Sequence, residues 1–254
     1  MNVKRLLVWA AQEPKRMRFE CVSRTHVGLR RKINEDSIFV DSERGLWAVA
    51  DGMGGHDAGE MASAMVTDAL RCLPVSADLD ETAANAVEAL RQVNRELIEL
   101  ARSGEGESGT IGTTVVGLAI ADGSYRCFWM GDSRAYLVRE GEISRVSRDH
   151  SLVQDLVDAG MLEPEEAETH ENANLITRAV GAARSFEVDI VKGDARPGDQ
   201  FLLASDGLTR VMRDHELAAE LEGGSLAEAA DDMIETVLSR GAPDNVSLVI
   251  TKVL

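Results

Sequence analysis

Three apolar segments that each end in an aspartate constrain this chain more than any other feature of its sequence. The aspartates and the segments before them are Asp51 after Leu46–Ala50, Asp132 after Cys127–Gly131, and Asp206 after Phe201–Ser205. Short apolar runs of this kind predict buried β-strands. A carboxylate at the rim of an apolar core is costly unless it is paired or binds a cation. The pattern therefore predicts strands that bring acidic side chains to a cation.

Metal ions are the partners that the sequence favours for these aspartates, because few cationic side chains lie beside them along the chain. Carboxylate, carbonyl and water oxygens suit hard ions such as Mg²⁺, Mn²⁺ or Ca²⁺, and no thiolate stands at these positions. We favour Mg²⁺ or Mn²⁺. The pairs Asp51-Gly52 and Asp206-Gly207 add to this, since glycine lets a backbone carbonyl approach an ion closely. A single Asp-Gly pair is a common turn, so the inference rests on their joint occurrence.

The charge and the cysteines exclude several partners. The net charge of −17 leaves no basic surface field for nucleic acid or an anionic membrane. It would also repel a phosphorylated substrate, so bound cations would have to attract one. The three cysteines lie far apart and form no C-x-x-C pair, which fits a reducing cytoplasm rather than a disulfide framework or a zinc site. The apolar run Leu6–Ala11 is too short for a signal peptide or a membrane span.

The periodicity predicts a basic lead-in at residues 1–18 and a single domain over residues 19–254, with a flap at about 149–174. Strands are predicted at 19–25, 37–40, 46–50, 113–120, 125–130, 135–138, 143–146, 187–191, 200–204 and 246–253. Helices are predicted at 58–71, 79–101, 152–159, 214–221 and 226–239. The fold class is an α/β (α+β) layered sandwich in which two packed, mainly antiparallel sheets are flanked by helix pairs.

Further motifs surround the three aspartates in a fixed order. They are Arg31-x-x-Asn34-Glu35-Asp36, Asp51-Gly52-Met53-Gly54-Gly55, Gly112-Thr113-Thr114, Gly131-Asp132-Ser133-Arg134, Asp149-His150-Ser151, Ser205-Asp206-Gly207 and Asp244-Asn245. This set resembles the type 2C, or PPM, protein serine/threonine phosphatases in their bacterial stand-alone form. The resemblance covers about Cys21 to the C-terminus, nearly the whole chain.

The resemblance implies a centre of two Mn²⁺ or Mg²⁺ ions with a possible third. Asp51 would bridge the two ions, with Asp206 and Asp244 completing the first site. Glu35 and the Gly52 carbonyl would serve the second. The third, weaker ion would be bound by Asp132 together with Asp206.

The implied reaction is hydrolysis of phosphoserine and phosphothreonine in proteins by a metal-activated water. Arg31 and Asp36 join Asp51 as the catalytic residues: Arg31 would bind the phosphoryl group and Asp36 would hold water at the metal centre. A guanidinium suits phosphate because it offers two parallel donors. The expected partners are phosphorylated proteins, including a serine/threonine kinase or its targets, and the chain is expected to be a cytoplasmic monomer.

One position departs from the pattern. Some family members have a histidine directly after the Asp-Gly pair, a candidate proton donor to the leaving group, and this chain has Met53. His56 could substitute, but a structural role is the better interpretation for it and for His150.

Two other classes of function stay open from the sequence. One is a catalytically inactive relative that binds phosphoproteins, against which the intact Glu35, Asp51, Asp206 and Asp244 weigh. The other is a hydrolase of small phosphate esters or nucleotides with the same core chemistry. The D-x-D-x-T pattern at Asp78–Thr82 lacks the apolar strand that an aspartate-nucleophile phosphatase needs, and is interpreted as a helix start.

Overall fold

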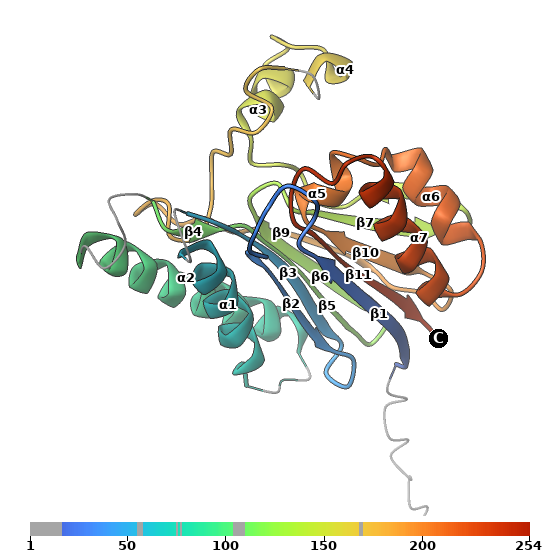
Figure 1. Cartoon of the computed structure of the whole chain (residues 1–254). Helices are drawn as coiled ribbons and strands as arrows, with labels where there is room; N and C mark the ends of the chain where they lie inside the picture. Colours follow the sequence, from blue (N-terminus) through green and yellow to red (C-terminus); the bar gives the residue numbers. More distant parts are fainter. Residues whose placement is uncertain (1–16, 55–57, 75, 77, 104–109, 168–169) are drawn as a thin grey trace, which may run out of the picture.

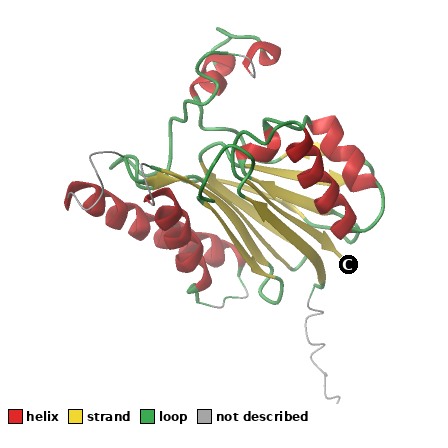
Figure 2. Ribbon diagram, in the orientation of Figure 1, coloured by secondary structure: helices red, strands yellow, loops and turns green. Residues whose placement is uncertain are grey.

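Two antiparallel β-sheets pack face to face between two layers of helices in the computed structural model, as the sequence predicts (Figure 1, Figure 2). The structure describes residues 17–54, 58–74, 76, 78–103, 110–167 and 170–254. One sheet has the order β1-β11-β10-β7-β8 and the other β2-β3-β5-β6-β9, with the short β4 paired to β3. The strands are β1 (Phe19–His26), β2 (Asp36–Asp41), β3 (Leu46–Met53), β4 (Gly112–Thr113), β5 (Val115–Ala121), β6 (Ser124–Met130), β7 (Arg134–Arg139), β8 (Glu142–Arg145), β9 (Asp189–Asp194), β10 (Gln200–Ala204) and β11 (Val246–Val253).

Each sheet is covered on its outer face by its own helices. The helices are α1 (Ala58–Arg71), α2 (Leu79–Ser103), α3 (Leu152–Asp158), α4 (Pro164–Ala167), α5 (Asp206–Thr209), α6 (Asp214–Glu222) and α7 (Leu226–Ser239). The apolar sides of α1 and α2 pack on the sheet that contains β3, and those of α5, α6 and α7 pack on the sheet that contains β10. Helices α3 and α4 stand apart from these layers, above one end of the sandwich (Figure 1).

A third apolar cluster fills the space between the sheets. Trp47 and Val49 of β3 and Val116 of β5 meet Leu203 of β10 and Val249 of β11 there, and all five are fully buried. Their neighbours in the strands face the helices instead. Because both faces are covered, these strands read as continuous apolar runs rather than as alternating patterns. This explains why the aspartates at their ends stand out in the sequence.

Gly117 gives a stability prediction for this sandwich. The residue pairs with Phe128 across β5 and β6, and a Cβ atom there would lie 2.2 Å from the Phe128 ring. We expect Gly117→Ala to lower the free energy of unfolding by about 1–3 kcal/mol, the usual cost of overpacking a core. Urea unfolding followed by circular dichroism would measure it. Gly223→Ala is the matched control, since no atom lies within 4 Å of its added Cβ; equal effects of the two substitutions would contradict the prediction.

Each predicted helix and strand overlaps an element of the structure, but some bounds differ, as for the strand predicted at 187–191, where β9 spans Asp189–Asp194. The predicted strand at 113–120 is wrong as a single element, because Thr114 interrupts it between β4 and β5. The Thr114 amide donates to the Asp51 carbonyl at 2.8 Å and its hydroxyl contacts that of Ser133 at 2.7 Å. The short helices α4 and α5 were not predicted. The pattern at Asp78 is confirmed as a helix start, since Asp78 Oδ1 accepts the Asp80 amide at 2.8 Å where α2 begins.

Some predictions concern residues that the structure does not describe, namely residues 1–16 of the lead-in, His56, and positions 168–169 of the flap. The division into a lead-in, one domain and a flap stays a prediction. In the described part of the chain, no helix combines the length and apolar character that crossing a membrane requires.

Candidate metal centre

A cavity of about 270 Å³ lies where the strand ends of the two sheets meet. The predicted site residues that line it are Arg31, Glu35, Asp51, Gly52, Asp132, Asp206 and Asp244. They come from five separate stretches of the chain, and the packing of the two sheets brings them together. Asp36 lies behind the cavity wall, directly opposite Asp51 in the β2–β3 ladder.

The carboxyl groups of Asp36 and Asp51 are buried together. Burial, with a smaller contribution from the charge of nearby Asp206, raises the pKa of Asp36 to about 7. One Asp36 oxygen accepts the Ser205 hydroxyl at 2.9 Å, while the other is buried without a hydrogen bond. Burial, followed by the charges of Asp206 and Asp36, raises the pKa of Asp51 well above its usual range. The two carboxyl groups are thus poised to gain from a cation.

Asp206 enters the site where β10 ends and α5 begins. Burial raises the pKa of this carboxyl group, and the charge of Asp244 adds to that effect. The next residue, Gly207, packs so closely on β11 that a Cβ atom would lie 1.8 Å from the Asn245 carbonyl oxygen. Only glycine permits this approach. Close packing on β11, and not only the turn, therefore requires glycine after Asp206.

Asn245 holds the loop that carries Arg31 and Glu35. Its side-chain oxygen accepts the Glu35 amide at 2.8 Å, and its side-chain nitrogen donates to the carbonyls of Val27 at 2.8 Å and Ile33 at 3.0 Å. These three bonds fasten the loop to the start of β11. In the sequence, the one signal for a role of Asn245 is its place beside Asp244 in the Asp244-Asn245 motif.

Two arginines pair with the acidic residues of the cavity. Arg31 Nη2 lies 2.7 Å from Asp244, with half of the arginine side chain exposed at the rim. Arg210 Nη2 lies 2.8 Å from Asp132, and its Nε lies 2.9 Å from Asp206. The expectation of few nearby cations is therefore wrong for Asp206. Arg210 stands four residues after it, a spacing that becomes a contact only because α5 forms.

The donor set fits hard divalent cations. All of the candidate side-chain donors are carboxylate oxygens, which Mg²⁺ and Mn²⁺ prefer. Glu35 Oε1 is buried without a hydrogen-bond partner, like one oxygen of Asp36. Among the residues described, no three His, Cys, Asp or Glu side chains already form a group that could hold one ion. Two of the carboxylates form ion pairs instead, Asp132 with Arg210 and Asp244 with Arg31.

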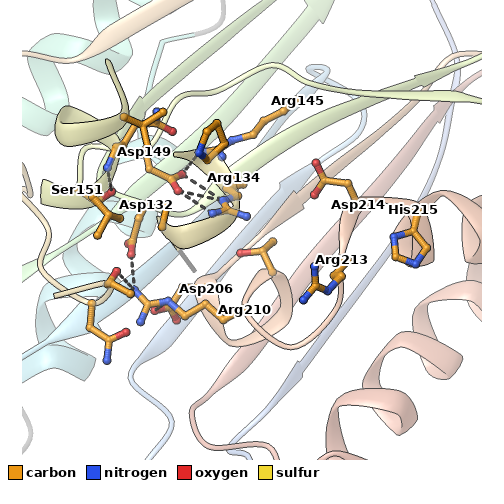
Figure 3. A pocket seen from close by; sticks show the side chains of 18 residues that line it. Asp132, Arg134, Arg145, Asp149, Ser151, Asp206, Arg210, Arg213, Asp214 and His215 are labelled. Atoms are coloured by element: carbon orange, nitrogen blue, oxygen red, sulfur yellow. Dashed lines mark hydrogen bonds and ion pairs between the residues drawn. The ribbon is translucent and has the colours of Figure 1, made fainter. Parts of the chain in front are cut away.

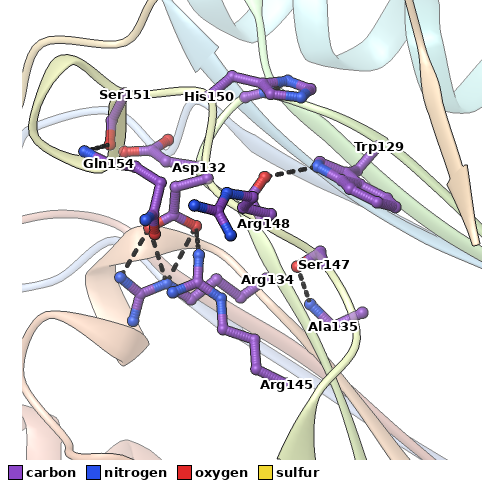
Figure 4. Close-up of polar contacts among 12 residues, drawn as sticks. Trp129, Asp132, Arg134, Ala135, Arg145, Ser147, Arg148, His150, Ser151 and Gln154 are labelled. Carbon is purple, nitrogen blue, oxygen red and sulfur yellow. Dashed lines mark hydrogen bonds and ion pairs between the residues drawn. The ribbon is translucent and has the colours of Figure 1, made fainter. Parts of the chain in front are cut away.

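A larger cavity of about 580 Å³ adjoins the first and shares Asp132, Asp206 and Arg210 with it (Figure 3). Its wall contains an ion-pair cluster in which Asp149 binds Arg134 at 2.8 Å and also contacts Arg145 (Figure 3). Figure 4 shows the side chains of Arg134 and Arg145 from close by. Asp149 is thus tied to two strands, β7 through Arg134 and β8 through Arg145, so the cluster holds the segment after β8 in place. Glu35, whose buried Oε1 has no hydrogen-bond partner, lines the smaller cavity and not this one.

The described histidine beside the site has a structural role, as predicted. His150 Nδ1 accepts the Gly131 amide at 3.2 Å, and its Nε2 lies 3.3 Å from Asp189. Burial lowers the pKa of His150 and keeps the ring neutral near pH 7. Met53 lines the cavity and offers no proton.

Comparison with known proteins places these features in a family context. Residues 26–253 match the family described as Protein phosphatase 2C. The serine/threonine protein phosphatase PstP of Mycobacterium tuberculosis is 37% identical over 235 residues, which are 91% of this chain and 44% of PstP. The chain thus spans less than half of PstP. The serine/threonine phosphatase stp of Listeria monocytogenes is 32% identical over 237 residues, or 90% of this chain and 94% of that protein.

Solved structures agree with the sequence comparison. The catalytic domain of PstP in complex with two manganese ions has a TM-score of 0.84 at 36% identity, covering 94% of this chain and 99% of that one. PppA, described as a key regulatory component of the T6SS in Pseudomonas aeruginosa, has a TM-score of 0.85 at 36% identity, covering 93% and 98%.

Proposed function

Because this chain belongs to the protein phosphatase 2C family, we propose that it hydrolyses phosphoserine and phosphothreonine in proteins with the help of divalent metal ions. The observation that carries the proposal is the convergence of Glu35, Asp51, Asp206 and Asp244 on one cavity, with Arg31 at its rim. Relatives of similar length are serine/threonine phosphatases, which supports the same activity here.

Residues of this chain would hold two ions, Mn²⁺ or Mg²⁺. Asp51 would contact both, Asp206 and Asp244 would complete one site, and Glu35 with the Gly52 carbonyl would complete the other. The manganese ions in the related PstP structure support this count. When bound, the ions supply an activated water for attack on phosphorus and neutralise negative charge. The third ion that the family resemblance implies at Asp132 is not part of this proposal.

The remaining chemistry belongs to the protein. Arg31 binds the phosphoryl oxygens, since its half-exposed guanidinium sits at the rim and can offer two parallel donors. Asp36 holds water at the inner wall through its oxygen that has no hydrogen-bond partner. Asn245 fixes the loop that presents Arg31 and Glu35, so that both keep their places during the reaction.

Phosphorylated proteins are the proposed substrates, including the targets of a serine/threonine kinase or the kinase itself. We place the protein in the cytoplasm as a monomer, with the flap at about 149–174 beside the cavity. Asn174 and Ile176, which follow the flap helices, line the cavity and support this position.

The test is hydrolysis of a phosphothreonine peptide by metal-stripped protein after addition of Mn²⁺, Mg²⁺, Ca²⁺ or no ion. We expect Mn²⁺ or Mg²⁺ to restore activity and Asp206→Asn to abolish the restored activity, because it removes a proposed ligand charge. A nucleotide and a small phosphate ester serve as competing substrates. Preference for either of them would favour the small-ester hydrolase, and inactivity of folded protein in every ion would favour a binding module. Sedimentation of the same preparation reports whether it is monomeric.

A further inference from the structure

Arg210 forms ion pairs with two acidic residues that follow strands of different sheets. Asp132 follows β6, and Asp206 follows β10 in the opposite sheet. The arginine reaches both at once, with Nη2 at 2.8 Å from Asp132 and Nε at 2.9 Å from Asp206 (Figure 3). The same Nη2 lies 3.5 Å from the Ala173 carbonyl at the end of the flap. The guanidinium therefore occupies the space between the two cavities.

The two carboxylates need a cation at this point. The Asp132 side chain is 8% exposed and that of Asp206 is 16% exposed, so water screens them poorly. The fixed guanidinium supplies one positive charge and directed donors to both. A divalent ion placed between the same oxygens would have to displace those donors and would be repelled by the charge at close range. Arg210 and such an ion are thus mutually exclusive.

We propose that Arg210 is a built-in cation that takes the place of a third metal ion between Asp132 and Asp206. The inference rests on the proposed function, since it concerns the same centre. It makes Arg210 a positioning residue: it holds Asp206 ready for the remaining ions without touching the substrate. It also means that the chain binds fewer divalent ions than the family resemblance implies.

The test counts bound ions rather than activity. Metal-stripped wild type, Arg210→Ala and Arg210→Gln are titrated with Mn²⁺, and free Mn²⁺ is followed by electron paramagnetic resonance. We expect wild type to saturate at about two ions per chain and both variants at about three, with the additional ion held more weakly. Adding Asp132→Asn to Arg210→Ala should return the count to about two, because the third ion loses a ligand.

Arg24→Ala is the matched control. Arg24 pairs with Asp231 on the surface, so the substitution changes the net charge equally at a distant place, and its count should equal that of wild type. Arg210→Gln keeps a long polar side chain, so the test stands even where Arg210→Ala fails to fold. Two outcomes would overturn this inference and leave the proposed function standing. In one, wild type binds a third ion as tightly as the variants do; in the other, the folded variants bind no additional ion. Wild type that binds no Mn²⁺ would overturn the proposed function as well.

Discussion

Replacing Asp51 with asparagine is expected to lower kcat/KM on a phosphothreonine peptide by at least about 10³-fold, or about 4 kcal/mol of transition-state stabilisation. Asp51 is the residue that would contact both ions, and asparagine lacks the charge that holds them. Among the carboxylates of the cavity, Asp51 also has neighbours that oppose its ionisation on more than one side, namely Asp206, Asp36 and Asp132.

The same substitution should stabilise the metal-free protein. Burial raises the pKa of Asp51 in the folded state, so the folded chain binds a proton more tightly than the unfolded chain. The penalty is absent below the unfolded pKa and grows as pH rises above it. Asp51→Asn removes the penalty, and we expect a larger rise in Tm at pH 8 than at pH 5, about 2–4 °C for each kcal/mol of repulsion removed.

Calorimetry without metal and steady-state kinetics with Mn²⁺ would measure the two effects. Asp68→Asn is the control, because Asp68 lies on the exposed side of α1 with 73% of its side chain accessible; neither quantity should change. Activity above about a tenth of wild type, or a Tm that falls in the metal-free variant, would contradict the role given to Asp51.

Replacing Arg31 with alanine is expected to lower kcat/KM by about 10²–10³-fold, the range seen when a donor to transition-state charge is removed. Mn²⁺ affinity should stay within about threefold of wild type or rise, because Asp244 loses the guanidinium at 2.7 Å that competes with a metal ion for its oxygens. Arg31→Lys should have a kcat/KM between those of wild type and Arg31→Ala, since lysine keeps the charge but not the parallel donors.

Activity titrations and Mn²⁺ binding by electron paramagnetic resonance separate the two effects. The neighbouring Arg30, which is exposed, provides the control Arg30→Ala with the same change in net charge. Parallel loss of activity and of Mn²⁺ binding in Arg31→Ala would mean that Arg31 shapes the metal centre rather than binding phosphate. Equal losses in the Arg30 and Arg31 variants would mean that only overall charge matters.

The periodicity of apolar residues along the chain was enough to predict much of the fold. The helices α1 and α7 and the strands β10 and β11 lie at the predicted positions, because their side-chain periods match one face or two faces of a core. The aspartates after β3, β6 and β10 marked the site because a charge at the end of a buried apolar run is costly without a cation. The order of the motifs then indicated the family.

Pairwise contacts of the site depended on the tertiary structure. Asp132 meets Arg210 across 78 positions of sequence, and Glu35 meets Asn245 across 210. A periodic pattern reports which face of an element is buried, but not which loops two packed sheets bring together. The raised pKa of Asp36 likewise comes from burial and from Asp206 in the opposite sheet. The sequence alone determined that acidic residues stand at the ends of buried strands. Only the packing of the two sheets decided which of them share a cavity and which arginine lies between them, because those contacts join segments far apart in the chain.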